Sequence, residues 1–338
     1  LAQYKNFGIK TIQAEDEIAA ISSSIGSAFG GTLAVTGTSG PGLDLKSEAI
    51  GYAVMTELPL VVLNIQRGGP STGLPTKSEQ TDLLAAMYGR HGEAPVPVLA
   101  TATPGDCFYM VLEAFRLALK YMTPVIVLSD GGLANASEPW KIPDENKLPD
   151  LRPDFHIEPE NFSPYHRNLQ TLARNWAIPG TPGLEHRLGG LEKDSVTGEI
   201  NYEPENHERM VLLRDEKIKR IKNDLPPLEI IGPEKNELLV VTWGSVYGPA
   251  FSAIEELQEH GHPVSMVHLR HLNPFQNNLE GILRNFEKVL VPEMNLGQLS
   301  RLLRAEFLVE TIPFAKVQGR PFLISEIRSR IIELLVEK

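Results

Sequence analysis

The chain has 338 residues and a formal net charge of −11, with 42% hydrophobic and 22% charged residues. These values indicate a globular protein of about two domains, and the acidic balance argues against nucleic acid or an anionic membrane as a partner. No apolar run approaches the roughly 20 residues of a membrane span. The one cysteine, Cys107, excludes a disulfide or a four-cysteine cluster within the chain.

The first third of the chain, residues 1–135, predicts an α/β domain. Five β-rich runs are predicted as strands: Lys10–Gln13, Leu33–Thr36, Leu60–Ile65, Val96–Ala100 and Val125–Ser129. Residues 106–121 predict a helix that is capped by Asp106. Its apolar stripe has 3/4 spacing and consists of Phe108, Val111, Leu112, Phe115 and Leu119. The alternation of strands and helices predicts a parallel sheet with helices on both faces.

The remaining residues predict a connector followed by a second α/β domain. Residues 136–235 are rich in proline, with turn signals such as Pro179-Gly180, and only about Asn206–Lys222 reads as a helix. Residues 236–338 predict a smaller domain, with buried strands at Leu238–Trp243, Val264–Leu269 and Val289–Val291. Between the first two strands a helix is marked by Ala250, Ala253, Ile254 and Leu257.

Three loops follow predicted strands at their carboxyl ends, where open parallel sheets bind ligands. In the first, Gln13–Glu17, acidic residues open a helix with small residues that let a flat ring approach, although acids there also simply favour the helix dipole. In the second, Thr36–Gly42, three glycines allow positive φ and expose N–H groups, or form a tight turn. The third, Gln66–Lys77, begins with Arg67, whose guanidinium suits a carboxylate ligand or a surface salt bridge.

With these loops the chain resembles the alpha subunits of the 2-oxoacid:ferredoxin oxidoreductases, most closely those acting on 2-oxoglutarate. The matching segments span nearly the whole chain in order: residues 13–20, 38–42, 66–76, 183–186 and 293–299. The resemblance implies a thiamine-diphosphate-binding fold. The first domain would be of the pyrimidine-binding type, and the last third would be similar to the C-terminal domain of transketolase.

The same resemblance implies the roles of particular residues. Thiamine enzymes have a glutamate at a helix start and a glycine nine positions later, a spacing that Glu17 and Gly26 show. Glu17 would be the catalytic carboxylate that hydrogen-bonds N1′ of the cofactor's aminopyrimidine and so promotes loss of the thiazolium C2 proton. Arg67 and Thr76 would bind the 2-oxoacid. The segment that would lie against the pyrimidine ring is Ser39, Gly40, Pro41 and Gly42.

Two features of the family are missing from the sequence. A Tyr-Pro-Ile-Thr-Pro-type segment usually precedes the stretch beginning at Gln13, but the chain starts only a few residues upstream, at Leu1, as a piece of a longer protein would. The Gly-Asp-Gly motif with its asparagine pair, which holds the cofactor's diphosphate and Mg²⁺, is also missing. We therefore expect no metal on this chain. Mg²⁺ and a [4Fe-4S] cluster are expected on a beta subunit that shares the thiamine diphosphate.

The expected reaction is oxidative decarboxylation of 2-oxoglutarate to succinyl-CoA and CO2, with coenzyme A as acyl acceptor and ferredoxin as electron acceptor. The expected assembly is a cytoplasmic αβ heterodimer or (αβ)2. Pyruvate or branched-chain 2-oxoacids are alternative substrates, because the sequence shows no second cation for the extra carboxylate of 2-oxoglutarate. A non-catalytic α/β scaffold that binds a nucleotide or a partner protein is an alternative from another class.

Overall fold

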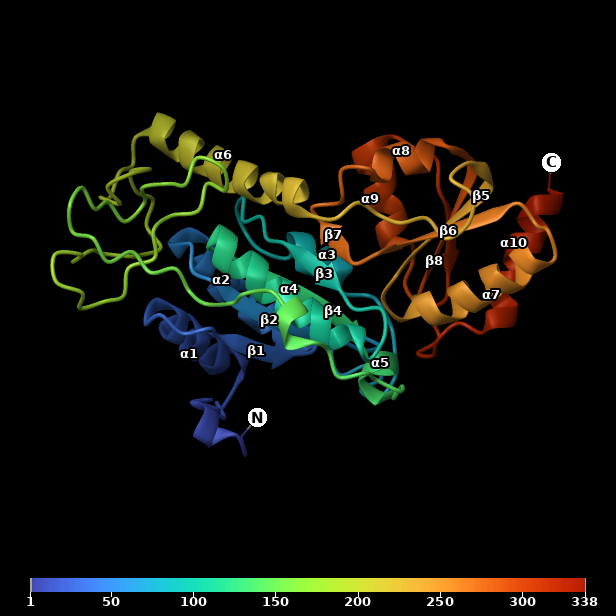
Figure 1. Ribbon diagram of the computed structural model, residues 1–338, viewed down its shortest axis with the longest axis horizontal. Helices are drawn as coiled ribbons and strands as arrows, with labels where there is room; N and C mark the ends of the chain where they lie inside the picture. Colours follow the sequence, from blue (N-terminus) through green and yellow to red (C-terminus); the bar gives the residue numbers. More distant parts are fainter. Residues whose placement is uncertain (1, 338) are drawn as a thin grey trace.

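The computed structural model describes residues 2–337, so the outer ends of the predicted domains, Leu1 and Lys338, lie outside the described residues. Two α/β units lie side by side, with the N-terminus on one and the C-terminus at the far side of the other (Figure 1). The first unit has a five-stranded sheet of order β1-β2-β4-β3-β7. Its strands are β1 (Val35–Thr38), β2 (Leu60–Gln66), β3 (Val98–Ala100), β4 (Pro124–Asp130) and β7 (His271–Asn273).

The predicted parallel sheet is confirmed for β1 to β4. The fifth strand, β7, comes from the last third of the chain and pairs antiparallel with β3. The prediction of a strand at Lys10–Gln13 is wrong: these exposed residues form no ladder, and the sheet ends on this side at β1. The strand predicted at Leu33–Thr36 lies two residues later, because Val35–Thr38 is the stretch that pairs with β2.

Helices cover both faces of this sheet, as predicted. One face packs against α1 (Glu17–Phe29), α2 (Gly40–Thr56) and α3 (Leu83–Tyr88). The other face packs against α4 (Asp106–Tyr121) and the end of α6 (Pro204–Arg220). Strand residues alternate between the two cores, so that Leu60 and Val62 face α1 and α2 while Val61 faces α4.

The helix predicted at residues 106–121 is confirmed, but Asp106 is not its cap, and the residues of the predicted stripe are not among its buried residues. The side chains of α4 that are buried against the sheet include small ones, Ala114 and Ala118, and the predicted stripe is only partly buried. The stripe is divided between two surroundings: Phe115 packs against the core under the sheet, and Leu119 packs beside Trp176 of the connector. Gly105 is the N-cap, and the carboxylate of Asp106 accepts a hydrogen bond from the Ala102 amide at 2.8 Å.

The second unit has a parallel four-stranded sheet of order β6-β5-β8-β9. Its strands are β5 (Asn236–Trp243), β6 (Val264–Leu269), β8 (Phe286–Glu293) and β9 (Ile312–Ala315). One face packs against α7 (Tyr247–Glu259) and α10 (Ile324–Val336). The other packs against α8 (Leu279–Arg284) and α9 (Gln298–Phe307), and its core is continuous with that of the first unit. The four apolar residues that predicted α7 are all buried.

A buried glutamine joins the two units. The Gln80 amide nitrogen donates to the Trp243 carbonyl at 2.8 Å, and its side-chain oxygen accepts from the Met294 amide at 3.0 Å. Asn295 donates to the Gln80 carbonyl at 2.7 Å. The segment 293–299 that carried part of the family resemblance is thus a structural element of the interface between the units.

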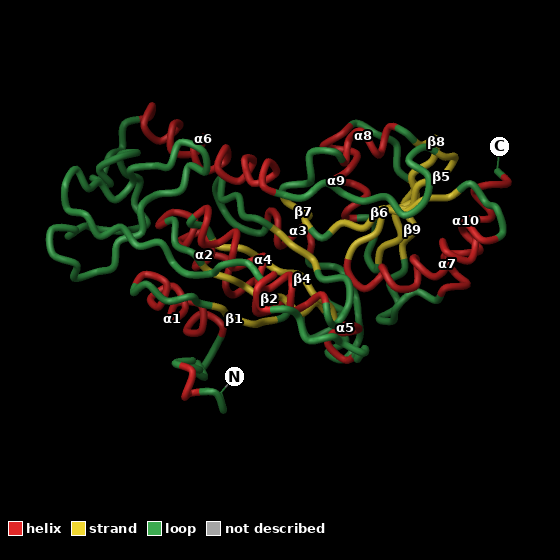
Figure 2. Tube along the Cα trace, in the orientation of Figure 1, coloured by secondary structure: helices red, strands yellow, loops and turns green. Residues whose placement is uncertain are grey.

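Between α5 (Gly131–Asn135) and α6, Figure 2 draws the chain almost entirely as loop, which agrees with the predicted irregular connector. The helix predicted near Asn206–Lys222 is α6, followed by a short 3-10 turn. The domain boundaries at residues 135 and 235 stay a prediction. Over residues 2–337, none of the helices combines the length and apolar character that a membrane crossing needs.

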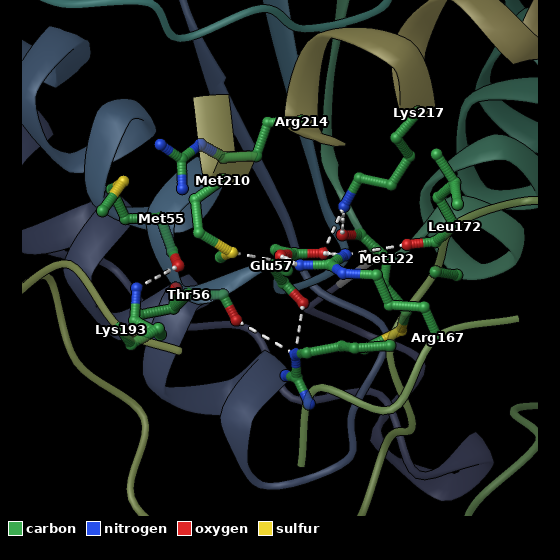
Figure 3. A network of polar contacts seen from close by, with 12 residues as sticks. Met55, Thr56, Glu57, Met122, Arg167, Leu172, Lys193, Met210, Arg214 and Lys217 are labelled. Atoms are coloured by element: carbon green, nitrogen blue, oxygen red, sulfur yellow. Dashed lines mark hydrogen bonds and ion pairs between the residues drawn. The ribbon is translucent and has the colours of Figure 1, made fainter. Parts of the chain in front are cut away.

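The connector and α6 are fixed to the C-terminal end of α2 by a buried ion network around Glu57 (Figure 3). Glu57 is fully buried, and its carboxylate accepts hydrogen bonds from Lys217 and from Arg167, each at 2.6 Å. Arg174 and Lys193 donate to main-chain carbonyls at the end of the same helix. Cations stabilise the negative end of a helix dipole. The network therefore holds the C-terminal end of α2 in place, and the N-terminal end of the same helix begins at Gly40.

Candidate functional site

Glu17 is the first residue of α1, and the two acidic residues before it, Glu15 and Asp16, differ in their contacts. Asp16 is the N-cap, and its Oδ1 accepts a hydrogen bond from the Ala19 amide at 2.8 Å. Glu15 is exposed. The side chain of Glu17 is half-buried, and no hydrogen bond joins its carboxylate to residues 2–337. Asp16 thus accounts for the capping interaction, which leaves Glu17 free for another partner.

The segment Thr36–Gly42 is not the loop with positive φ that the sequence predicts. β1 runs to Thr38, Ser39 is the N-cap of α2, and Gly40, Pro41 and Gly42 form the first turn of the helix. None of its glycines has a positive φ. Glycine is needed at position 42 for space: a Cβ there would collide with Thr38 Oγ1 and would lie 2.6 Å from Glu17 Cγ.

The start of α2 and the start of α1 are therefore in direct contact. Gly42 lets the Glu17 side chain lie against the first turn of α2, where backbone N–H groups lack partners within the helix. This turn is at the carboxyl end of β1, because Thr38 ends that strand. The structure thus brings two of the predicted elements together, Glu17 and the segment 39–42.

Arg67 follows β2 directly and begins a loop whose two ends lie together. We call these two ends, residues 67–68 and 76–77, the loop neck. The Gly68 amide donates to the Lys77 carbonyl at 3.0 Å, so the two ends of the loop lie together, with exposed Thr76 beside the second end. Within residues 2–337 the guanidinium of Arg67 forms no ion pair, and its buried Nε has no hydrogen-bond partner. A half-buried guanidinium with no carboxylate within ion-pair distance suits an anionic ligand.

Asp82 lies between these two parts of the site and was not predicted from the sequence. A Cβ on Gly40 would be 2.9 Å from Asp82 Oδ2, and the same oxygen accepts a hydrogen bond from Asn64 at 2.9 Å. Burial raises the pKa of Asp82, while the Asn64 bond and the charge of Arg67 oppose that rise. The sequence does contain a sign of a polar partner here: Asn64 and Gln66 are polar residues in an otherwise apolar strand, and buried polar groups need hydrogen-bond partners. Both of them bond Asp82.

Comparison with known proteins decides the family. The sequence matches the family model described as pyruvate flavodoxin/ferredoxin oxidoreductase, thiamine diP-bdg, over residues 1–203, and pyruvate:ferredoxin oxidoreductase core domain II over residues 236–327. Over 97% of its length it is 56% identical to the 2-oxoglutarate oxidoreductase subunit KorA of Mycobacterium tuberculosis. Over 98% of its length it is 35% identical to the 2-oxoglutarate synthase subunit KorA of Archaeoglobus fulgidus, of which it covers 86%. The chain belongs to the alpha subunits of the 2-oxoacid:ferredoxin oxidoreductases.

Solved structures agree with this family. The 2-oxoglutarate:ferredoxin oxidoreductase from Magnetococcus marinus, solved with 2-oxoglutarate, coenzyme A and succinyl-CoA bound, matches 99% of this alpha-subunit chain with a TM-score of 0.95 and 37% identity. A split gene transketolase at 13% identity, with a TM-score of 0.52 over 94% of this chain and 81% of its own, shares the fold alone. The predicted thiamine-diphosphate-binding α/β fold with transketolase-like architecture is confirmed.

This 2-oxoacid:ferredoxin oxidoreductase chain is shorter than several of its relatives. It spans 50% of the Mycobacterium tuberculosis protein and 59% of the Magnetococcus marinus chain. The predicted site residues gather at the carboxyl ends of β1 and β2, which are adjacent parallel strands. Residues 39–42 follow β1, Arg67 follows β2, and Glu17 reaches this edge through its contact with Gly42.

Proposed function

We propose that this chain is part of an enzyme that oxidatively decarboxylates 2-oxoglutarate in the presence of coenzyme A and transfers the electrons to ferredoxin. The products are succinyl-CoA, CO2 and reduced ferredoxin. The family supports the reaction class, and the names of the Mycobacterium tuberculosis and Archaeoglobus fulgidus relatives support the substrate. Pyruvate and branched-chain 2-oxoacids are the competing substrates to be tested.

The observation that carries the proposal is the contact between Glu17 and the start of α2. The half-buried carboxylate has no hydrogen-bond partner in residues 2–337, and Gly42 leaves the first turn of α2 open to a close approach. These residues fit the pyrimidine ring of thiamine diphosphate, which has nitrogen atoms for the carboxylate and a flat face for the backbone at residues 39–42. When bound, this cofactor supplies a carbanion that attacks the 2-oxoacid and an electron sink for decarboxylation.

In this proposal the residues of the chain bind and orient the reactants. Glu17 holds a proton at the pyrimidine nitrogen, and Ser39, Gly40, Pro41 and Gly42 lie against the ring. Arg67 pairs with the carboxylate of the 2-oxoacid, and Thr76 at the other end of the loop neck lines the reacting centre. A beta subunit supplies the diphosphate site, Mg²⁺ and the [4Fe-4S] cluster that passes electrons to ferredoxin.

Isothermal titration with thiamine diphosphate and Mg²⁺ tests this division of the site. We expect tight binding by the complex of alpha and beta subunits and little heat from the alpha chain by itself, because the diphosphate supplies much of the binding energy. No binding by the complex would favour the alternative of a non-catalytic scaffold. Turnover of 2-oxoglutarate, pyruvate and a branched-chain 2-oxoacid by the same complex then ranks the substrates.

Substitution of Arg67 by methionine should mainly weaken substrate binding. We expect KM for the 2-oxoacid to rise by about 10- to 100-fold, as for loss of a charged hydrogen bond, with a smaller change in kcat. The control is Lys77→Met, which removes an exposed cation from the other end of the same loop neck. An unchanged KM in Arg67→Met would argue against the carboxylate-binding role.

A further inference from the structure

Lys46 is a fully buried lysine within α2. Its ammonium donates a hydrogen bond to the main-chain carbonyl of Glu17 at 3.1 Å. No carboxylate of residues 2–337 lies within ion-pair distance of it. Burial of an ammonium costs free energy unless other groups compensate, so this position needs a physical reason.

The spacing along α2 connects Lys46 to the contact already described. Gly42 and Lys46 are four residues apart, so they lie one turn apart on the same face of the helix. Gly42 makes room for the side chain of Glu17, and Lys46 holds the main-chain carbonyl of the same residue. One face of α2 therefore contacts Glu17 twice, at its side chain through Gly42 and at its main-chain carbonyl through Lys46.

The electrostatic setting is unusual for a cation. Lys46 reaches the first turn of α1, which is the positive end of that helix dipole. Burial lowers the pKa of Lys46, and the charges of Glu17 and Asp16 oppose this effect. The other buried lysines near α2 instead bond carbonyls at the C-terminal ends of helices, Lys193 at α2 and Lys217 at α4, and Lys217 also bonds the carboxylate of Glu57. A local arrangement that costs stability is expected where a site must be held in one geometry.

We propose that Lys46 is a positioning residue that fixes the first turn of α1 on α2 and so keeps the Glu17 carboxylate aimed at the cofactor ring. The proposal rests on the role proposed above for Glu17. Lys46 itself does not touch the reacting atoms. It acts through the main chain of Glu17 and through its charge, which attracts the neighbouring carboxylates of α1.

The test compares Lys46→Met with Lys193→Met in the full complex. Methionine has nearly the length of lysine but lacks its charge and its donor. Lys193 is a matched control, because its buried ammonium also donates to a main-chain carbonyl at 3.1 Å, at the opposite end of α2. We expect Lys46→Met to lower kcat by at least about tenfold without a change in KM for the 2-oxoacid, because reacting groups are sensitive to misplacement. Lys193→Met should keep kcat within about twofold even where it lowers stability more.

Hydrogen exchange of the alpha chain without cofactor gives a second readout. In Lys46→Met the amides of residues 18–25 should exchange at least about tenfold faster, because the bond to Glu17 is lost, whereas Lys193→Met should leave them unchanged. Lys46→Arg, which keeps the charge and the donor, should recover much of the kcat. A kcat for Lys46→Met within twofold of wild type, or an equal loss of kcat in Lys193→Met, would overturn the proposal.

Glu17→Gln separates this proposal from the proposed function. If Glu17→Gln abolishes turnover and Lys46→Met does not affect it, the positioning role is wrong and the role of Glu17 stands. If Glu17→Gln turns over at the wild-type rate, the role of Glu17 fails, and the positioning role of Lys46 fails with it.

Discussion

Replacement of Glu17 by alanine is expected to lower turnover of the 2-oxoacid by about 10²- to 10⁴-fold, the range that a positioned proton-transfer group contributes. The physical reason is that the variant lacks the half-buried carboxylate at the start of α1, which we propose bonds the cofactor ring. Nothing else in the described contacts replaces it, because Asp16 is used as the helix cap. Steady-state reduction of ferredoxin or a dye by the alpha–beta complex measures the effect.

Glu15→Ala is the matched control for this prediction. Glu15 carries the same charge two residues earlier and is exposed, so its loss changes the local charge without touching α2. We expect turnover within about twofold of wild type for Glu15→Ala, as for most surface substitutions. Equal losses in both variants would mean that net charge at the helix start matters and that Glu17 has no particular role.

The second large effect is expected on stability, from Glu57→Gln. The change leaves Lys217 and Arg167 buried without their carboxylate, which costs about 3–5 kcal/mol in comparable buried pairs. Urea unfolding of the alpha chain, followed by tryptophan fluorescence, measures this loss. Trp176 is a suitable reporter because it is buried beside Met122, whose carbonyl also accepts a hydrogen bond from Lys217.

The pH dependence of this variant gives an independent check. Burial alone would raise the pKa of Glu57, but Lys217 and Arg167 hold it far below the usual range. A lowered carboxyl pKa stabilises the fold above about pH 4, and the stabilisation is lost as the pH falls. Glu57→Gln should therefore lose this acid dependence. The control Asp150→Asn removes an exposed pair in the same connector, and we expect no measurable change in stability. Equal stability of Glu57→Gln and wild type would contradict the account of the connector.

The elements that the sequence predicted best are those whose pattern depends on local packing. α7 is correct in both its position and its buried face, since four apolar residues at helical spacing meet one sheet. α4 is correct in position only, because its buried face consists of Met110, Ala114, Leu117, Ala118 and Tyr121, whereas the predicted stripe is half-buried or exposed. A periodic stripe indicates a helix, but it does not show which face of that helix is buried.

The parts of the site that the sequence could not predict depend on contacts between residues far apart in the chain, or on the room left for a neighbouring side chain. Gly40 and Gly42 suggested positive φ, but neither has it. Close approach of Asp82 to Gly40 and of Glu17 to Gly42 explains them, and either cause selects glycine. Nothing in the sequence singles out Lys46, because its contact with Glu17 of α1 forms only when the chain folds. Glu57 and Lys217 lie 160 positions apart, so no spacing rule connects them.

A structure of the alpha–beta complex with thiamine diphosphate tests the central claim most directly. It should show a carboxylate oxygen of Glu17 about 2.6–3.2 Å from a pyrimidine nitrogen, with residues 39–42 against the ring. A Glu17 side chain in solvent, with a different acidic residue bonded to that nitrogen, would contradict the account.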